Sequence, residues 1–175
     1  MPNWTIGHST RAIDNFISLL EENQIKLLVD VRAFPGSKRY PQFNKDALAE
    51  SLTAHGIRYE HLPELGGKRK SSADSRNTAW RNTSFRGYAD YMETKQFQKG
   101  IERLLDLAAK AGPTAIMCAE AVWWRCHRSL IADYLKARGM EVLNILGANK
   151  IEPHPYTPAA RIVNDKLSYE PDSLL

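Results

Sequence analysis

Segments with strand character alternate with segments of helical periodicity along most of the chain, and this alternation limits the possible fold more than any other feature. The clearest strand is KLLVDVR at residues 26–32, an almost continuous apolar run of the kind found in a sheet covered on both faces. The segment before it carries apolar residues at the spacing of one helix face, namely Ile13, Phe16, Ile17 and Leu20. Repeated alternation of this type predicts an α/β fold with a mainly parallel sheet, helices on both faces and right-handed crossovers.

The same patterns predict the individual elements. The predicted strands are Trp4–His8, Lys26–Arg32, Ile57–Leu62, Thr114–Cys118 and Glu141–Leu146. The predicted helices lie at about 13–20, 44–55, 85–107 and 129–138. We therefore expect a single domain over residues 1–175 with a five-stranded sheet, a long basic loop at about 63–84 and a tail at about 147–175. Two short segments of the tail flank Asn164-Asp165, which predicts a small hairpin.

Polar residues stand at the carboxyl ends of the predicted strands. His8 ends the first strand, Asp30 and Arg32 end the second, and Cys118 and Glu120 follow the fourth. In a parallel sheet these ends lie along one edge, which is where open α/β folds bind ligands. We interpret these residues as a site, and the alternative is an internal Asp–Arg network that ties the end of the sheet together.

The two cysteines of the chain fall in one short stretch, MCAEAVWWRCHRSLIADYL. Cys118 ends a predicted strand, whereas Cys126, His127 and Arg128 open the next helix, where thiolates and anions are favoured. Three interpretations stay open: a nucleophilic or redox thiol, a metal site and simple packing of small apolar side chains. The spacing matches no common zinc pattern, so we assign no metal ligand, and the cofactor is unknown.

The predicted loop at about 63–84 is basic. The basic residues from Leu65 to Arg86 outnumber the single acid, Asp74, and they are Lys68, Arg69, Lys70, Arg76, Arg81 and Arg86. A local positive field of this kind attracts anions, although a solvated loop would look the same. Trp80, Trp123 and Trp124 lie near basic residues, which is a weak signal for nucleic-acid binding.

Several sequence features bear on the cellular compartment of the protein. The first residues, MPNWTIGHS, lack the basic start and apolar run of a signal peptide, and no apolar stretch reaches the length of a membrane span. The two cysteines do not form a disulfide framework, which favours a reducing compartment. We expect a cytoplasmic protein with no membrane partner. The oligomeric state is not readable.

Several segments together resemble the family called domain of unknown function 488, namely TIGHST, LVDVRAFPGS, FNKDALAESLTAHGIRYEHLPELGG, FRGYADYM and MCAE followed by CHRSLIADYL. The resemblance implies a small α/β domain with no assigned activity. Its motif positions here are His8, Ser9, Asp30, Arg32, Pro35, Ser37, Gly66, Gly67, Cys118, Glu120, Cys126, His127 and Arg128. The chain departs from the pattern at Asn144 and Trp123, where the family often has His and Pro.

These observations lead to one hypothesis with two alternatives. The leading hypothesis is an enzyme acting on an anionic substrate, a nucleotide or nucleic acid, with catalytic residues Cys118, His8, Asp30 and Glu120. Substrate binding is assigned to Arg32, Ser37, Gly66, Gly67, Cys126, His127 and Arg128, with the basic loop as a lid. The alternatives are a non-catalytic nucleic-acid-binding module and a metal-binding protein.

Overall fold

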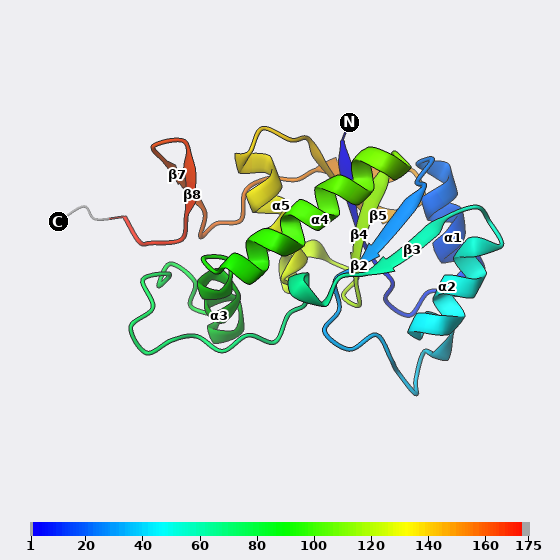
Figure 1. The fold of residues 1–175 in the computed structure, drawn as a ribbon, viewed down its shortest axis with the longest axis horizontal. Helices are drawn as coiled ribbons and strands as arrows, with labels where there is room; N and C mark the ends of the chain where they lie inside the picture. The colour runs from blue at the N-terminus through cyan, green and yellow to red at the C-terminus, as the bar shows by residue number, and fades with distance from the viewer. Residues whose placement is uncertain (1, 173–175) are drawn as a thin grey trace.

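The computed structural model describes residues 2–172 and contains one six-stranded sheet, a separate two-stranded hairpin and five α-helices (Figure 1). The strands are β1 (Asn3–Gly7), β2 (Leu27–Asp30), β3 (Arg58–His61), β4 (Thr114–Cys118), β5 (Val142–Gly147), β6 (Lys150–Pro153), β7 (Arg161–Val163) and β8 (Lys166–Ser168). The helices are α1 (Ile13–Glu22), α2 (Lys45–Thr53), α3 (Thr83–Tyr91), α4 (Lys95–Ala111) and α5 (Arg128–Ala137).

The order of strands in the main sheet is β3-β2-β4-β1-β5-β6. The first five strands are parallel, as predicted, and β6 pairs antiparallel with β5. The prediction of five strands is therefore wrong by one edge strand, which lies in the segment expected to be a tail. The reason is local: Asn149 adopts a left-handed conformation with φ of 54° and turns the chain back beside β5.

Successive strands are added toward the β3 edge of the sheet in the first half of the chain and toward the β6 edge in the second half. This reversal places helices on both faces. The connections β1–α1–β2 and β2–α2–β3 run one way, whereas β3–α4–β4 and β4–α5–β5 run the other. Right-handed crossovers then put α1 and α2 on one face and α4 and α5 on the opposite face. Two separate apolar clusters confirm this, one containing Phe16 and Leu48, the other containing Leu104 and Leu130.

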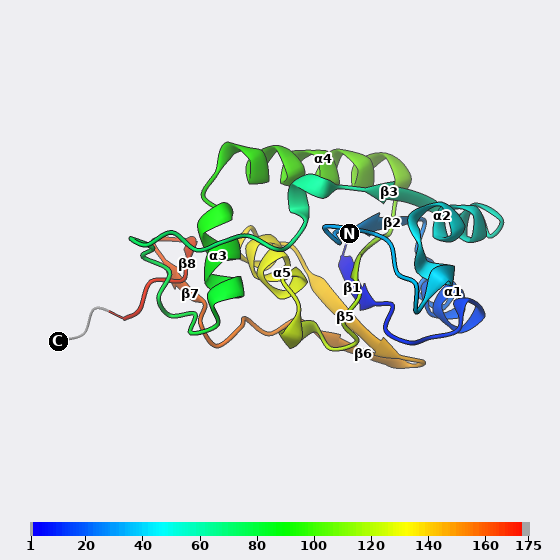
Figure 2. The same ribbon diagram turned by 90° about the horizontal axis from the view of Figure 1, so that it is seen from below.

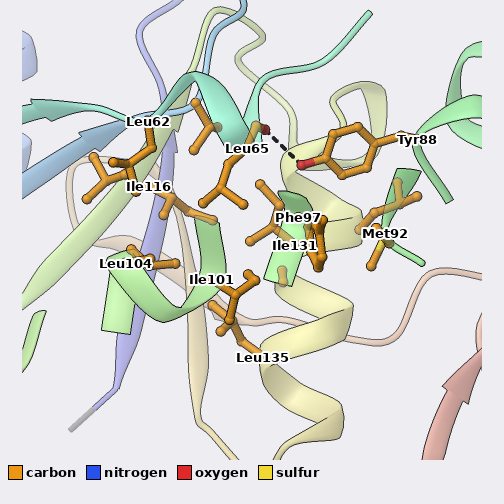
Figure 3. Close-up of a cluster of buried hydrophobic side chains, with 14 of the residues drawn as sticks. Leu62, Leu65, Tyr88, Met92, Phe97, Ile101, Leu104, Ile116, Ile131 and Leu135 are labelled. Carbon is orange, nitrogen blue, oxygen red and sulfur yellow. Dashed lines mark hydrogen bonds between the residues drawn. The ribbon is translucent and has the colours of Figure 1, made fainter. Parts of the chain in front are cut away.

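The second cluster extends beyond the sheet to α3 (Figure 3). Tyr88 of α3 lies fully buried in it, and its Oη donates a 2.8 Å hydrogen bond to the carbonyl of Leu65 (Figure 3). The single helix predicted over 85–107 is in fact two, because the chain leaves α3 at Tyr91 and Thr94 caps the start of α4. Figure 2 shows α3 and the β7–β8 hairpin together at one end of the molecule, with α1 and α2 at the other.

The predicted hairpin in the C-terminal segment is confirmed. The hairpin β7–β8 turns at Asn164 and Asp165, which have positive φ of 53° and 64°. Residues 173–175 of the predicted tail lie outside the described residues. Within the described part of the chain, no helix is both long and apolar enough to span a membrane.

Candidate functional site

The polar residues predicted from the strand ends do gather at the carboxyl edge of the sheet. Gly7 of β1 pairs in register with Cys118 of β4, and Asp30 of β2 pairs with Met117 of β4 and His61 of β3. The side chains divide between the two faces, however. Cys118 packs in the cluster beneath α4 and α5, whereas Asp30 points to the face covered by α1 and α2.

Asp30 and Arg32 form a buried ion pair on the face of α1 and α2. The two nitrogens Nε and Nη2 of Arg32 lie 2.9 and 2.8 Å from the carboxylate oxygens of Asp30, the bidentate geometry that guanidinium favours. Nη2 also donates to the carbonyl of Phe43 at 2.7 Å, and the hydroxyl of Tyr59 donates to Asp30 at 2.5 Å. The Arg32 guanidinium is thus fully engaged within the protein.

His8 belongs to this same group. Its ring stacks on Phe43 with 4.4 Å between centroids, and its Nε2 accepts from Arg32 Nη1 at 3.3 Å. Its Nδ1 lies 2.9 Å from the carbonyl of Ser9, so the neutral ring carries its proton on Nδ1. Burial lowers the pKa of His8 below its usual 6.5. Both ring nitrogens are therefore occupied by contacts other than Cys118.

Cys118 is joined instead to Arg128, the first residue of α5. Nη1 of Arg128 lies 2.6 Å from Cys118 Sγ and 2.6 Å from the carbonyl oxygen of Glu120. Nη2 donates to the carbonyl of Ala121 at 3.4 Å, and Nε donates to Thr5 Oγ1 at 3.3 Å. Arg128 has no exposed surface.

The two thiols shift each other's pKa in opposite directions. Burial by itself would raise the pKa of Cys118, but the neighbouring Cys126 thiol and the Arg128 guanidinium lower it to about 7. Burial and the neighbouring Cys118 raise the pKa of Cys126 well above 9.0. Cys118 is therefore the thiol of the pair that ionises first, and Cys126 stays neutral.

His127 and the glycine pair flank this thiol group. His127 Nε2 lies 2.8 Å from the carbonyl of Val31, and Nδ1 lies 3.6 Å from Cys126 Sγ. Burial lowers the pKa of His127 to about 4, so the ring is neutral at pH 7. A side chain at Gly67 would stand 2.9 Å from Nδ1, and one at Gly66 would press on Ala33. The glycines permit this close approach.

The other predicted site residues lie in supporting positions. Glu120 reaches the thiol group through its backbone carbonyl, whereas its side chain is exposed. Ser37 Oγ accepts from the backbone nitrogens of Arg39 and Tyr40, which stabilises a turn. α5 begins at Arg128 with His127 as its cap residue, so Cys126 lies just before the helix in extended backbone.

The basic loop is anchored to α3 by Asp90. That carboxylate accepts hydrogen bonds from Ser72 N, Ser75 Oγ and Asn77 Nδ2 at 2.9, 2.5 and 2.7 Å. Arg69 of the loop lies 3.7 Å above the ring of Tyr91. Nearer the sheet edge, Lys68 Nζ lies 5.0 Å from the ring of Phe34, which is 74% exposed.

Sequence reasoning missed a buried polar network behind Arg128. It runs from the sheet into the C-terminal segment and comprises Thr5, Asp133, Asn144, His154, Thr157 and Tyr169. Asn144 stood out as a polar residue in a strand, but its partners come from distant segments. Asp133 offered a signal: it is an acid within the apolar stretch of α5 that contains Leu130, Ile131 and Leu135.

A cavity lies away from the thiols. It has a volume of about 1160 Å³ and opens between α3, α5 and the β7–β8 hairpin, with Met92, Arg138 and Leu167 among its lining residues. The cavity and the thiol group are therefore two separate candidate sites. We give more weight to the thiols, because a paired thiolate and guanidinium are reactive chemistry, whereas the cavity wall mixes both charges. Among residues 2–172, no group of three or more His, Cys, Asp and Glu side chains is arranged to hold a metal ion.

Comparison with known proteins identifies the family. The model of the family described as "Domain of unknown function DUF488" matches residues 12–135, which include every predicted site residue except His8. No curated protein and no solved structure matches the chain. The match covers most of the sequence, so the chain belongs to this family.

Proposed function

We propose that this member of the DUF488 family is an enzyme that acts on an anionic substrate, a nucleotide or nucleic acid, through a Cys118 thiolate. Cys118 serves as the nucleophile or redox centre, and Arg128 is its counterion. The proposal covers the class of chemistry at the sheet edge and leaves the reaction itself unnamed.

One observation carries the proposal: Arg128 is fully buried, and its side-chain hydrogen-bond partners within residues 2–172 include no carboxylate. A buried guanidinium without an anion costs several kcal/mol of desolvation. Cys118 Sγ at 2.6 Å is the one atom among these partners that can carry a negative charge. The charge balance of the site therefore supports a thiolate, which is the reactive form of cysteine.

The anionic substrate is supported by a second guanidinium near the first. Arg11 donates weakly to the carbonyls of Gly7 and Leu146, both at 3.3 Å, and is partly exposed. Burial and the nearby charge of Arg128 lower the pKa of Arg11, which shows that the two positive charges share one region. Since Arg32 and Arg128 are engaged internally, Arg11 and the exposed Lys68 are the better candidates to receive an anion.

Access to Cys118 requires movement. The side chain is 2% exposed, and the backbone of Glu120 lies against Sγ at 3.8 Å. The turn at residues 119–125, which includes the short helix Trp123–Arg125, must therefore shift before a substrate reaches the thiolate.

The proposal is tested by comparing two alkylating reagents that differ in charge. Iodoacetate is an anion, whereas iodoacetamide is neutral. The rate of Cys118 alkylation by iodoacetate divided by its rate with iodoacetamide should exceed the same ratio for glutathione by about tenfold at low salt. Arg11→Gln should abolish this preference, whereas the control Lys110→Gln, at the end of α4, should keep it. Trypsin cleaves after Arg125, so peptide mass spectrometry reads the two cysteines separately.

The same assay distinguishes the substrate classes. Protection of Cys118 by nucleoside monophosphates indicates a nucleotide substrate, and protection only by an oligonucleotide indicates nucleic acid. A reagent preference equal to that of glutathione would refute the anionic substrate. Complete absence of Cys118 labelling in the folded protein would refute the proposal that Cys118 is the reactive residue of an enzyme.

A further inference from the structure

A continuous chain of buried polar groups leads away from the thiolate through three neighbouring strands. Arg128 Nε donates to Thr5 Oγ1 at 3.3 Å, and Thr5 Oγ1 donates to Asn144 Oδ1 at 2.6 Å. Thr5 and Asn144 lie opposite each other in register on β1 and β5. Asn144 Nδ2 then lies 3.0 Å from Nδ1 of His154, a residue just after β6. All of these side chains are buried.

The chain ends at Asp133 of α5, which is held by the C-terminal segment. Its carboxylate accepts from His154 Nε2 at 2.9 Å, Thr157 N at 3.0 Å, Thr157 Oγ1 at 2.5 Å and Tyr169 Oη at 2.7 Å. The network thus returns to α5 little more than one turn beyond Arg128. Residues 136–172 lie outside the part of the chain matched by the family model.

Every hydrogen bond in this chain has a determined direction. A guanidinium is only a donor, so Thr5 Oγ1 accepts from Arg128 and must give its own proton to Asn144 Oδ1. Asn144 therefore presents its NH₂ group to Nδ1 of His154, which must be an unprotonated acceptor. The proton of His154 is left on Nε2 and points at Asp133. The orientation of each group depends on the next.

We infer that Thr5, Asn144, His154 and Asp133 are positioning residues that hold the Arg128 guanidinium against Cys118. The inference rests on the proposed function, because it explains how the thiolate is maintained. None of the four residues touches Cys118. Their effect passes through Nε of Arg128, which has Thr5 Oγ1 as its acceptor.

The inference assigns a role to the C-terminal segment. His154, Thr157 and Tyr169 stabilise Asp133, and His154 extends that anchoring to Arg128 through Asn144 and Thr5. If this series of hydrogen bonds is interrupted at Thr5 or His154, the Arg128 guanidinium loses a fixed acceptor and rotates more freely. The thiolate then loses part of its stabilisation, and the Cys118 pKa rises toward that of an ordinary thiol.

The test is a titration of Cys118 by carbon-13 NMR. Cysteine labelled at Cβ gives one signal for each of the two cysteines, and the Cys126→Ser variant assigns them. The groups facing Cys118 are Arg128, the Cys126 thiol and the Glu120 backbone, so the signal reports directly on that pair. Thr5→Val and His154→Leu should raise the Cys118 midpoint by about one pH unit. Thr5→Ser and His154→Gln, which keep the polar links, should restore the wild-type value.

Tyr169→Phe is the matched control, because it removes one bond to Asp133 without breaking the chain. It should lower the melting temperature and leave the Cys118 midpoint in place. If the wild-type midpoint is near 7 and the midpoints of both Thr5→Val and His154→Leu equal it, the inference is overturned, whereas the proposed function stands. A wild-type midpoint near 9 would instead overturn the proposed thiolate and with it the proposed function.

Discussion

Arg128 imposes the strictest chemical constraint on the site. Its fully buried charge has carbonyls, one hydroxyl and Cys118 Sγ as side-chain hydrogen-bond acceptors in the described part of the chain. Lysine would not replace it, because a single ammonium does not reach acceptors spread across a planar fork. The pair of Arg128 and Cys118 is therefore a structural feature as well as a chemical one, and it couples the stability of the protein to the charge of the thiol.

This coupling predicts a pH-dependent contribution to stability. The pKa of Cys118 falls from an ordinary value of 9.0 to about 7 in the folded protein, so between these values the unfolded chain binds more protons. The stabilisation is present above 9.0 and is lost as the pH falls through 7. Relative to Cys118→Ser, the free energy of unfolding of the wild type should rise by about 2 kcal/mol across that interval, measured by urea denaturation.

Titrating groups other than Cys126, whose pKa depends on Cys118, cancel in the difference between the two proteins, because only Cys118 is replaced. A constant difference from about pH 6.5 to about pH 8.5 would show that Cys118 is a neutral buried thiol, which is the packing interpretation. His127 has its effect at lower pH. Its lowered pKa of about 4 adds stability above 6.5 that is lost as the pH falls toward 4, in both proteins.

The turn between β4 and α5 encloses the thiolate because it is held by backbone contacts. The backbone nitrogens of His8 and Ser9 each donate at 2.9 Å, to the carbonyls of Cys118 and Ala119. Gly7 completes the fit, since a Cβ there would stand 1.6 Å from the carbonyl oxygen of Glu120. The end of β1 and the turn after β4 therefore behave as one packed unit above Cys118.

Gly7→Ala should break this unit. The added methyl meets backbone atoms that cannot move independently, so we expect a loss of about 3 kcal/mol of stability, measured by chemical denaturation. Cys118 should also react several-fold faster with iodoacetamide, because the covering turn is displaced. Gly147→Ala at the end of β5 is the control, since nothing lies within 4 Å of its added Cβ. Similar behaviour of the two variants would contradict the covering role of the turn.

Local periodicity predicted the parallel strands well and the rest of the architecture less completely. β4 was predicted with its observed bounds, Thr114–Cys118, because TAIMC is apolar and follows a Gly-Pro stop. β6 was missed because KIEP is exposed along its whole length and carries no alternation. The break between α3 and α4 was missed because the apolar face continues through Tyr91 into Phe97.

The candidate site was predicted as a set of residues but not as an arrangement. Strand order is not contained in local patterns, and it is the order β4-β1-β5 that sets Thr5 between Ile116 of β4 and Asn144 of β5. For the same reason the division of Asp30 and Cys118 between opposite faces of the sheet was not foreseen. The assignment of Arg32 and Arg128 to substrate binding stays a prediction, although both guanidiniums are buried against internal partners.

At the scale of the whole molecule, segments from both ends of the chain contribute to the surroundings of Cys118. β1, β4 and the start of α5 surround it, and the segment from β6 to Tyr169 anchors the arginine that stabilises it. The ionisation state of one sulfur atom therefore tests the interpretation of the site and of the network behind it.

Neutron diffraction from deuterated crystals at about pH 8.5, above the Cys118 pKa of about 7, measures that state directly. We predict no deuterium on Cys118 Sγ, a fully deuterated Arg128 guanidinium directed at it, and a deuterium retained on Cys126 Sγ. A deuterium found on Cys118 Sγ at this pH would contradict the account.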